Sequence, residues 1–154
     1  MTNPIKALWQ RCERLYNSNR TPLLLSLQES DGVSVNLLLL ALYLDQHHLL
    51  LPQATWYELN QHAEQFERRI LRPYRLRRKQ LKGLSSPCAY QNILMLELEL
   101  ERLLQQQLAS LLPQSIVQGN ANSQQKAGRT NNLNRYAHTR DLSLAQLTPI
   151  YSIN

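Results

Sequence analysis

The stretch that decides the fold runs from Val33 to Leu44 and reads VSVNLLLLALYL. Apolar side chains would surround a helix formed by these residues, and a helix that is apolar on all sides in a soluble protein is buried among its neighbours. Ser34 and Asn36 interrupt the stretch, which falls well short of the roughly 20 residues that a membrane-spanning helix needs. We therefore predict a buried central helix from Val33 to about His48.

The composition of the whole chain favours helices as well. The 154 residues include 33 leucines but only nine valines and isoleucines together, and only four glycines. Leucine is a strong helix former, whereas β-branched side chains favour strands. The sequence therefore predicts an all-α fold, a compact bundle of about five helices with a flexible C-terminal tail.

Short polar side chains that precede a proline mark helix starts. Such a side chain can cap the first turn, and a proline at the first helical position needs no N–H donor. The pairs are Asn3-Pro4, Thr21-Pro22 and Ser86-Pro87. Another start is predicted at Thr55, which has the spacing of a capping box with Glu58. The predicted helices span residues 4–16, 22–29, 33–48, 55–84 with an interruption at Pro73, and 87–112.

The chain changes character after residue 112. Gln, Asn, Ser and Gly crowd residues 114–134 without an apolar period, and such a segment buries too little surface to offset its ordering entropy. We therefore expect a helical domain over 1–112 and a polar, disordered tail over 113–154. A small apolar cluster within this tail is either part of a loose end or a docking segment for this domain or for a partner. It comprises Leu142, Leu144, Leu147, Ile150 and Tyr151.

Positive charge is concentrated in one segment. Residues 66–82 carry eight basic side chains and one acidic side chain. The next helix has an apolar stripe, and Glu97 and Glu101 lie in or beside it, so they need partners. The stripe comprises Ile93, Leu96, Leu100, Leu103, Leu104, Leu108 and Leu111. Because the connection at 83–86 is short, the two helices should be antiparallel neighbours.

This pairing predicts how the charges divide. Arg75 and Arg78 are expected to form structural ion pairs with Glu97 and Glu101, with Glu101 close to the turn at 68–72. A basic surface for an anionic partner is the functional interpretation of the remaining cations, and a solvated helix face is the alternative. The candidate binding residues are Arg69, Arg77, Lys79 and Lys82. Asn36, among leucines, is predicted to be a buried polar residue bonded to the backbone of a neighbouring loop, with a ligand contact as the alternative.

Several stretches resemble a known family when they are taken in order. Residues 25–28 read LSLQ, residues 35–39 read VNLLL, Pro73 begins PYRLRR with Lys82 following, and residues 97–101 read ELELE. This succession resembles a family of small proteobacterial proteins of unknown function, over about Ala7 to Leu112. The family tends to have Trp where this chain has Tyr43. The resemblance supports the domain boundaries and implies no activity.

The motifs of common enzyme and metal sites are missing from the sequence. His47 and His48 are adjacent and point in different directions on a helix, and the chain has no glycine-rich phosphate loop and no helical HExxH. Cys12 lies on a core stripe, and Cys88 falls in a first helical turn, where a dipole can lower the pKa of a thiol. We predict no cofactor, no metal and no catalytic residue.

The function predicted from sequence is that of a non-enzymatic interaction or regulatory protein. It would present a basic helix face to an unknown anionic protein partner, in the cytoplasm and away from membranes. The alternatives are association with RNA or the ribosome, through residues 68–82 and the arginines Arg129, Arg135 and Arg140, or an enzyme of unrecognised type.

Overall fold

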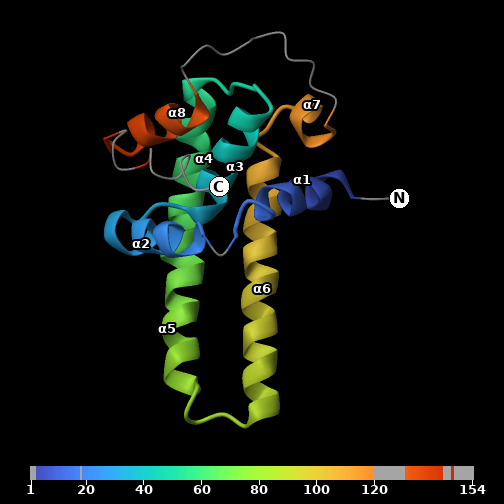
Figure 1. Ribbon diagram of the computed structural model, residues 1–154. Coiled ribbons are helices and arrows are strands. Elements are labelled where there is room, and N and C mark those ends of the chain that lie inside the picture. Colours follow the sequence, from blue (N-terminus) through green and yellow to red (C-terminus); the bar gives the residue numbers. More distant parts are fainter. Residues whose placement is uncertain (1–2, 18, 120–130, 144–146, 148–154) are drawn as a thin grey trace.

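A computed structural model of the chain describes residues 3–17, 19–119, 131–143 and 147, and within them every regular element is a helix (Figure 1). The first four are α1 (Pro4–Glu13), α2 (Thr21–Asp31), α3 (Val35–Gln46) and α4 (Gln53–Phe66). A π-helix, η1 (Glu67–Leu71), joins α4 to α5 (Arg72–Leu81). The remaining helices are α6 (Pro87–Ala109), α7 (Gln114–Val117) and α8 (Asn132–Thr139).

Helix α3 is the centre of the molecule, as its sequence predicts. Every residue from Leu37 to Leu44 is buried. Helices α1, α2 and α8 pack against α3, and α4 packs against α8 and α6. None of the helices in the described part of the chain is both long and apolar enough to cross a membrane.

The polar residues before proline cap two of the three predicted helices. The Asn3 side chain accepts a hydrogen bond from the backbone of Ile5, and the Ser86 side chain accepts one from Ala89. Thr21 instead lies inside α2 and donates its hydroxyl proton to the carbonyl of Asn17. The capping box predicted at Thr55 is wrong, because α4 already begins at Gln53.

Pro73 lies within the long helical segment from α4 to α5 and alters its local geometry without ending it. Helix α4 passes through the π-helical turn of η1 into α5, and Pro73 is near the start of α5. In a regular α-helix the proline ring clashes with the carbonyl four residues earlier. We attribute the wide turn before Pro73 to this clash, which it relieves while α4 and α5 remain one continuous rod.

The tail expected after residue 112 contains helices that pack on the core. Ile116 and Val117 of α7 are buried, and α8 is held between α3 and α4. Leu147 is also buried, and Leu142 packs against the same core, so this part of the predicted apolar cluster docks on the domain itself. Residues 144, 150 and 151 of the cluster lie outside the described residues. The compositional argument failed for α8 because Leu133, Tyr136 and Ala137 are buried on one face of the helix, against α3 and α4.

Helix α8 is fixed by buried polar contacts. The Asn132 amide oxygen accepts hydrogen bonds from the Leu51 backbone at 2.9 Å and from Trp56 Nε1 at 3.3 Å, and its nitrogen donates to the carbonyl of Leu49. At the other end, Arg140 donates to Glu64 and to the carbonyl of Asp31. Residues predicted to lie in a free tail are therefore part of the body of the protein.

Helices α5 and α6 depart from the expected compact bundle. They run antiparallel and project away from the cluster formed by the other helices (Figure 1). Between the buried residues Leu71 and Leu104, no side chain is fully buried. We call Arg72–Leu103, with its turn at 82–86, the arm.

Candidate functional site

The arm is the most distinctive surface of the described chain. It carries seven cationic and three anionic side chains, a net charge of +4. Its two helices meet along a line marked by Tyr74 and Ile93, where the tyrosine hydroxyl donates a hydrogen bond of 2.6 Å to the isoleucine carbonyl. The chemistry of the arm depends on which side chains fall on each side of that line.

One side of the arm is closed by ion pairs. Arg75 donates hydrogen bonds to Glu67 at 2.7 Å and to Glu101 at 3.1 Å, and its Nε lies 3.3 Å from Glu97. Arg78 Nε lies 2.9 Å from the other oxygen of Glu97. The four residues expected to pair from sequence are thus brought together, and Glu67, which sequence reasoning did not include, joins them. Glu101 pairs with Arg75 and not with the cations of the turn at 68–72.

Two tyrosines support this network. The Tyr90 hydroxyl lies 3.4 Å from Arg78, and this hydrogen bond, with the nearby charge of Glu97, raises the pKa of the guanidinium. Burial between the helices and the charge of Glu97 raise the pKa of Tyr74. Both hydroxyls are therefore engaged inside the arm.

The cations singled out as binding candidates point to solvent. Arg69, Arg77, Lys79 and Lys82 are all exposed, and none forms an ion pair with a described residue. Arg77 only shares a hydrogen bond of 3.2 Å with Gln80, one turn further on. The internal network uses Arg75 and Arg78, and the charge left over faces outward.

The other side of the arm is apolar and open. Helical geometry places residues three, seven and ten positions after a facing residue on one flank, and residues four and eight positions after it on the opposite flank. On the first flank, counting from Tyr74 gives Arg77 and Leu81, and counting from Ile93 gives Leu96 and Leu103. Because the two helices are antiparallel, these residues lie on the same side of the arm. These leucines are 40%, 53% and 42% exposed. We call Leu81, Leu96 and Leu103 the leucine flank.

Sequence reasoning missed the leucine flank because it assigned the whole leucine stripe of α6 to the core. The stripe extends well beyond what one neighbouring helix can cover, and that width was the available signal. Leu104 and Leu108 reach the core, whereas Leu96 and Leu103 do not.

Asn36 does not have the predicted contacts. It is half-buried, and its side-chain oxygen accepts a hydrogen bond of 3.1 Å from the Gln105 amide of α6. Gln105 also donates to Glu13, and its carbonyl accepts from Trp9 Nε1 at 2.9 Å. Asn36 therefore helps to join α3, α1 and α6 through side-chain contacts and not by capping a loop.

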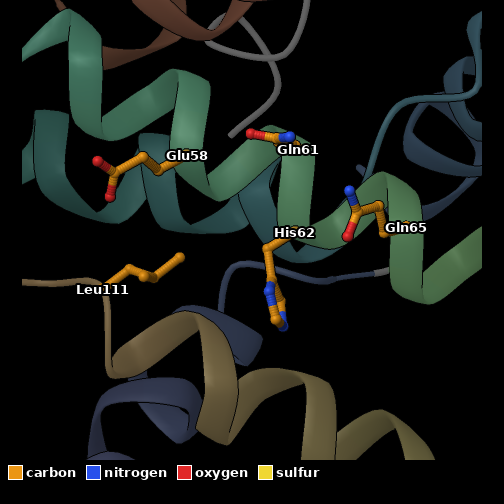
Figure 2. Close-up of a pocket in the computed structure, with 5 residues that line it drawn as sticks. All are labelled: Glu58, Gln61, His62, Gln65 and Leu111. Carbon is orange, nitrogen blue, oxygen red and sulfur yellow. The ribbon is translucent and has the colours of Figure 1, made fainter.

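A shallow pocket of about 180 Å³ lies between α4 and the residues just after α6, lined by Glu58, Gln61, His62, Gln65 and Leu111 (Figure 2). The His62 ring points toward α6, where its Nε2 lies 2.6 Å from Gln107, whereas the Glu58 carboxylate points elsewhere. The acid and the base do not converge, and the pocket lining contains no nucleophile. This pocket gives no support to a catalytic site.

The described residues also show no grouping for metal or thiol chemistry. No three His, Cys, Asp or Glu side chains among them are placed to hold one metal ion. Cys12 is buried in the core, and this burial, partly offset by the charge of Arg11, raises the pKa of its thiol to about 12. Cys88 is exposed near the tip of the arm. Cys12 thus packs as a small apolar side chain.

Comparison with known proteins gives one family match. A family model described as a protein of unknown function (DUF2390) matches residues 7–108. The matched region contains most of α1, all of α2 to α5 and nearly all of α6, and it stops before α7 and α8. No curated protein and no solved structure matches the chain.

Proposed function

This chain belongs to the DUF2390 family of proteins of unknown function, and we propose that it is a non-enzymatic interaction protein whose arm binds an acidic protein partner. The arm lies within the matched region. The observation that carries the proposal is the division of charge on the arm, where internal ion pairs use Arg75 and Arg78 and other cations are left exposed. A projecting hairpin also gives a partner access from several sides.

An acidic protein suits the arm better than RNA does. Proteins that bind single-stranded nucleic acid combine cations with aromatic side chains on which bases stack. The arm contains only Tyr74 and Tyr90 as aromatic residues, and both hydroxyls hold partners between α5 and α6. A protein surface rich in carboxylates needs no such stacking platform.

The arginines beyond the arm also give little support to RNA binding. Arg135 donates a hydrogen bond to the Leu51 carbonyl, and Arg140 is paired with Glu64. Both therefore hold α8 to the body. Arg129 lies outside the described residues.

The proposal is tested by capture of ligands on the full chain. Arg69→Ala/Arg77→Ala/Lys79→Ala removes three exposed cations. The matched control, Lys6→Ala/Arg14→Glu, lowers the net charge equally at exposed positions of the body. The probes are labelled polyglutamate and a labelled single-stranded RNA, each at two salt concentrations. We expect the triple variant to lose most of the polyglutamate binding and the control to keep it, with weaker binding at high salt because exposed charges are then screened.

Two results would reject the proposal. Equal loss in the triple variant and the control would mean that polyglutamate responds only to net charge. Preference for RNA over polyglutamate, abolished by the triple variant, would move the arm to the nucleic-acid class, and its affinity should then fall steeply with salt through counterion release.

A further inference from the structure

The leucine flank is a second feature of the arm that internal packing leaves uncovered. Antiparallel helices in a stable bundle usually bury their apolar stripe against at least two neighbours, and the arm has only two helices in all. The opposite side of the arm, formed by Arg75, Arg78, Glu97 and Glu101, is the ion-pair flank. It is complete without a third helix, because the two arginines satisfy the carboxylates that face them. The leucine flank has no corresponding cover among the described residues.

We infer that the leucine flank binds one amphipathic helix of the acidic partner and so completes a three-helix bundle. This inference rests on the proposed function and specifies how the partner is recognised. The bound helix would place its leucines against Leu81, Leu96 and Leu103. It would place a carboxylate beside Arg77, which lies on the same flank as Leu81.

The length of the flank fits a short helix. The hydrogen bonds from Tyr74 to Ile93 and from Arg78 to Tyr90 place Leu81 opposite the first turn of α6. From Pro87 to Leu103, α6 rises about 24 Å, and a partner helix of roughly 16 residues, between about four and five turns, spans that distance. Apolar side chains repeated every three or four residues on that helix would face the flank continuously.

Charge decides between a foreign helix and a second copy of this chain. Two arms packed together would each bring a net charge of +4 to the contact. Like charges across an interface are unfavourable, whereas a carboxylate that borders the leucine stripe of a bound helix would lie beside Arg77. This exposed cation of α5 and the net positive charge of the arm therefore complement an acidic amphipathic helix.

The probe is a synthetic 18-residue peptide with leucines at helical spacing and glutamates elsewhere. Two control peptides are used. A scrambled sequence tests the leucine pattern at the same composition, and the same leucine pattern with lysines in place of the glutamates tests the charge. Fluorescence anisotropy with the full chain should show binding of the acidic patterned peptide alone, and circular dichroism should show that this peptide gains helicity when bound. Equal binding of the scrambled peptide would overturn the inference.

Matched variants locate the contact. Leu96→Gln/Leu103→Gln changes the flank, and Met95→Gln/Leu98→Gln changes exposed side chains on the outer face of the same helix, which are 64% and 46% exposed. Glutamine keeps helix propensity, and thermal unfolding checks each fold. We expect the first pair to weaken peptide binding by about tenfold or more and the second by less than about twofold, because an amphipathic helix is held on an apolar surface by a few contacts of its apolar face.

Other outcomes separate this inference from the proposed function. If the Arg69/Arg77/Lys79 variant loses the peptide while Leu96→Gln/Leu103→Gln keeps it, the partner binds by charge alone, and only the inference fails. If neither variant weakens binding, both fail. A dimer in sedimentation velocity that Leu96→Gln/Leu103→Gln converts to a monomer would show that a second copy covers the flank, which also rejects the inference.

Discussion

The Oδ1 atom of Asp45, near the end of α3, accepts a hydrogen bond of 2.7 Å from the backbone N–H of Asn132, the first residue of α8. Its Oδ2 atom accepts another from the backbone of Leu133 at 3.3 Å. A carboxylate at this position satisfies N–H groups of the first turn and interacts favourably with the helix dipole. A residue of the central helix thus supplies the anion that holds α8 in place.

Asn132→Ala should therefore be among the more destabilising single changes. It removes hydrogen bonds to Leu51, Trp56 and Leu49 and leaves buried polar groups without partners. We expect a loss of about 2–4 kcal/mol in the free energy of unfolding, measured by urea denaturation. Asn134→Ala, on the same helix, is the control and should cost less than about 0.5 kcal/mol. Similar losses from both would mean that the buried hydrogen bonds of Asn132 are not what holds α8 to the body.

The ion-pair flank gives a second stability prediction. Glu97→Ala leaves Arg75 and Arg78 without a shared carboxylate that is only 13% exposed. Glu99→Ala removes one member of an exposed pair with Arg102. We expect a loss of about 1–3 kcal/mol for the first change and less than about 0.5 for the second, again from urea denaturation. If the two variants unfold at the same urea concentration, the pairing of α5 with α6 is not as described.

Replacing cations on the arm and on η1 should separate structure from binding. Arg75→Ala/Arg78→Ala should lower the melting temperature, because partly buried carboxylates lose their partners. Arg69→Ala/Arg77→Ala/Lys79→Ala should leave the melting temperature nearly unchanged, since exposed substitutions shift stability by about 0.5 kcal/mol at most. Differential scanning calorimetry measures both. A large drop in the triple variant would assign these cations to the fold and not to a partner.

Alkaline pH should destabilise the protein through Tyr136 and Cys12. Burial raises the pKa of Tyr136 from 10.0 to about 12, and burial also raises the pKa of Cys12 from 9.0 to about 12. The unfolded chain therefore loses these protons first. Stability is fully present below about pH 9 and falls as pH rises toward 12. Urea denaturation across this range measures the slope.

Tyr136→Phe tests the contribution of the tyrosine. The variant should be less stable at neutral pH, because it loses the hydrogen bond that the hydroxyl accepts from the Ser34 backbone at 2.9 Å. Its stability should also fall less steeply above pH 10 than that of the wild type. Tyr57→Phe, at an exposed position, is the control. If stability falls as steeply with pH in Tyr136→Phe as in the wild type, folding does not raise the pKa of this hydroxyl.

The sequence predicted the parts of the fold that depend on local signals. The uninterrupted apolar run at 37–44 required a buried helix, and Asn3 and Ser86 cap helices as their position before proline indicated. The spacing of the carboxylates and arginines along two helices joined by a short turn was enough to bring Arg75 close to Glu97.

The parts that were missed depend on contacts between distant residues. Helix α8 has a local cap at Asn131, but its position depends on Asp45, Leu51 and Trp56, which contact Asn132, and the sequence of residues 131–139 contains no signal for these contacts. The leucine flank was missed for the opposite reason. Periodicity shows that Leu96 and Leu103 share a face, but it does not show whether another helix covers that face.

The position of α8 affects how the protein is made. The space between α3 and α4 is completed by residues that follow Asp45 by 87 positions or more. At about 5–20 residues per second, a ribosome needs roughly 4–17 s to add them. During that interval Trp56 and its apolar neighbours lack the side chains that cover them later. A nascent chain stalled before Asn132 would therefore expose hydrophobic surface of the kind that chaperones bind. We expect such truncated products to be aggregation-prone or rapidly degraded.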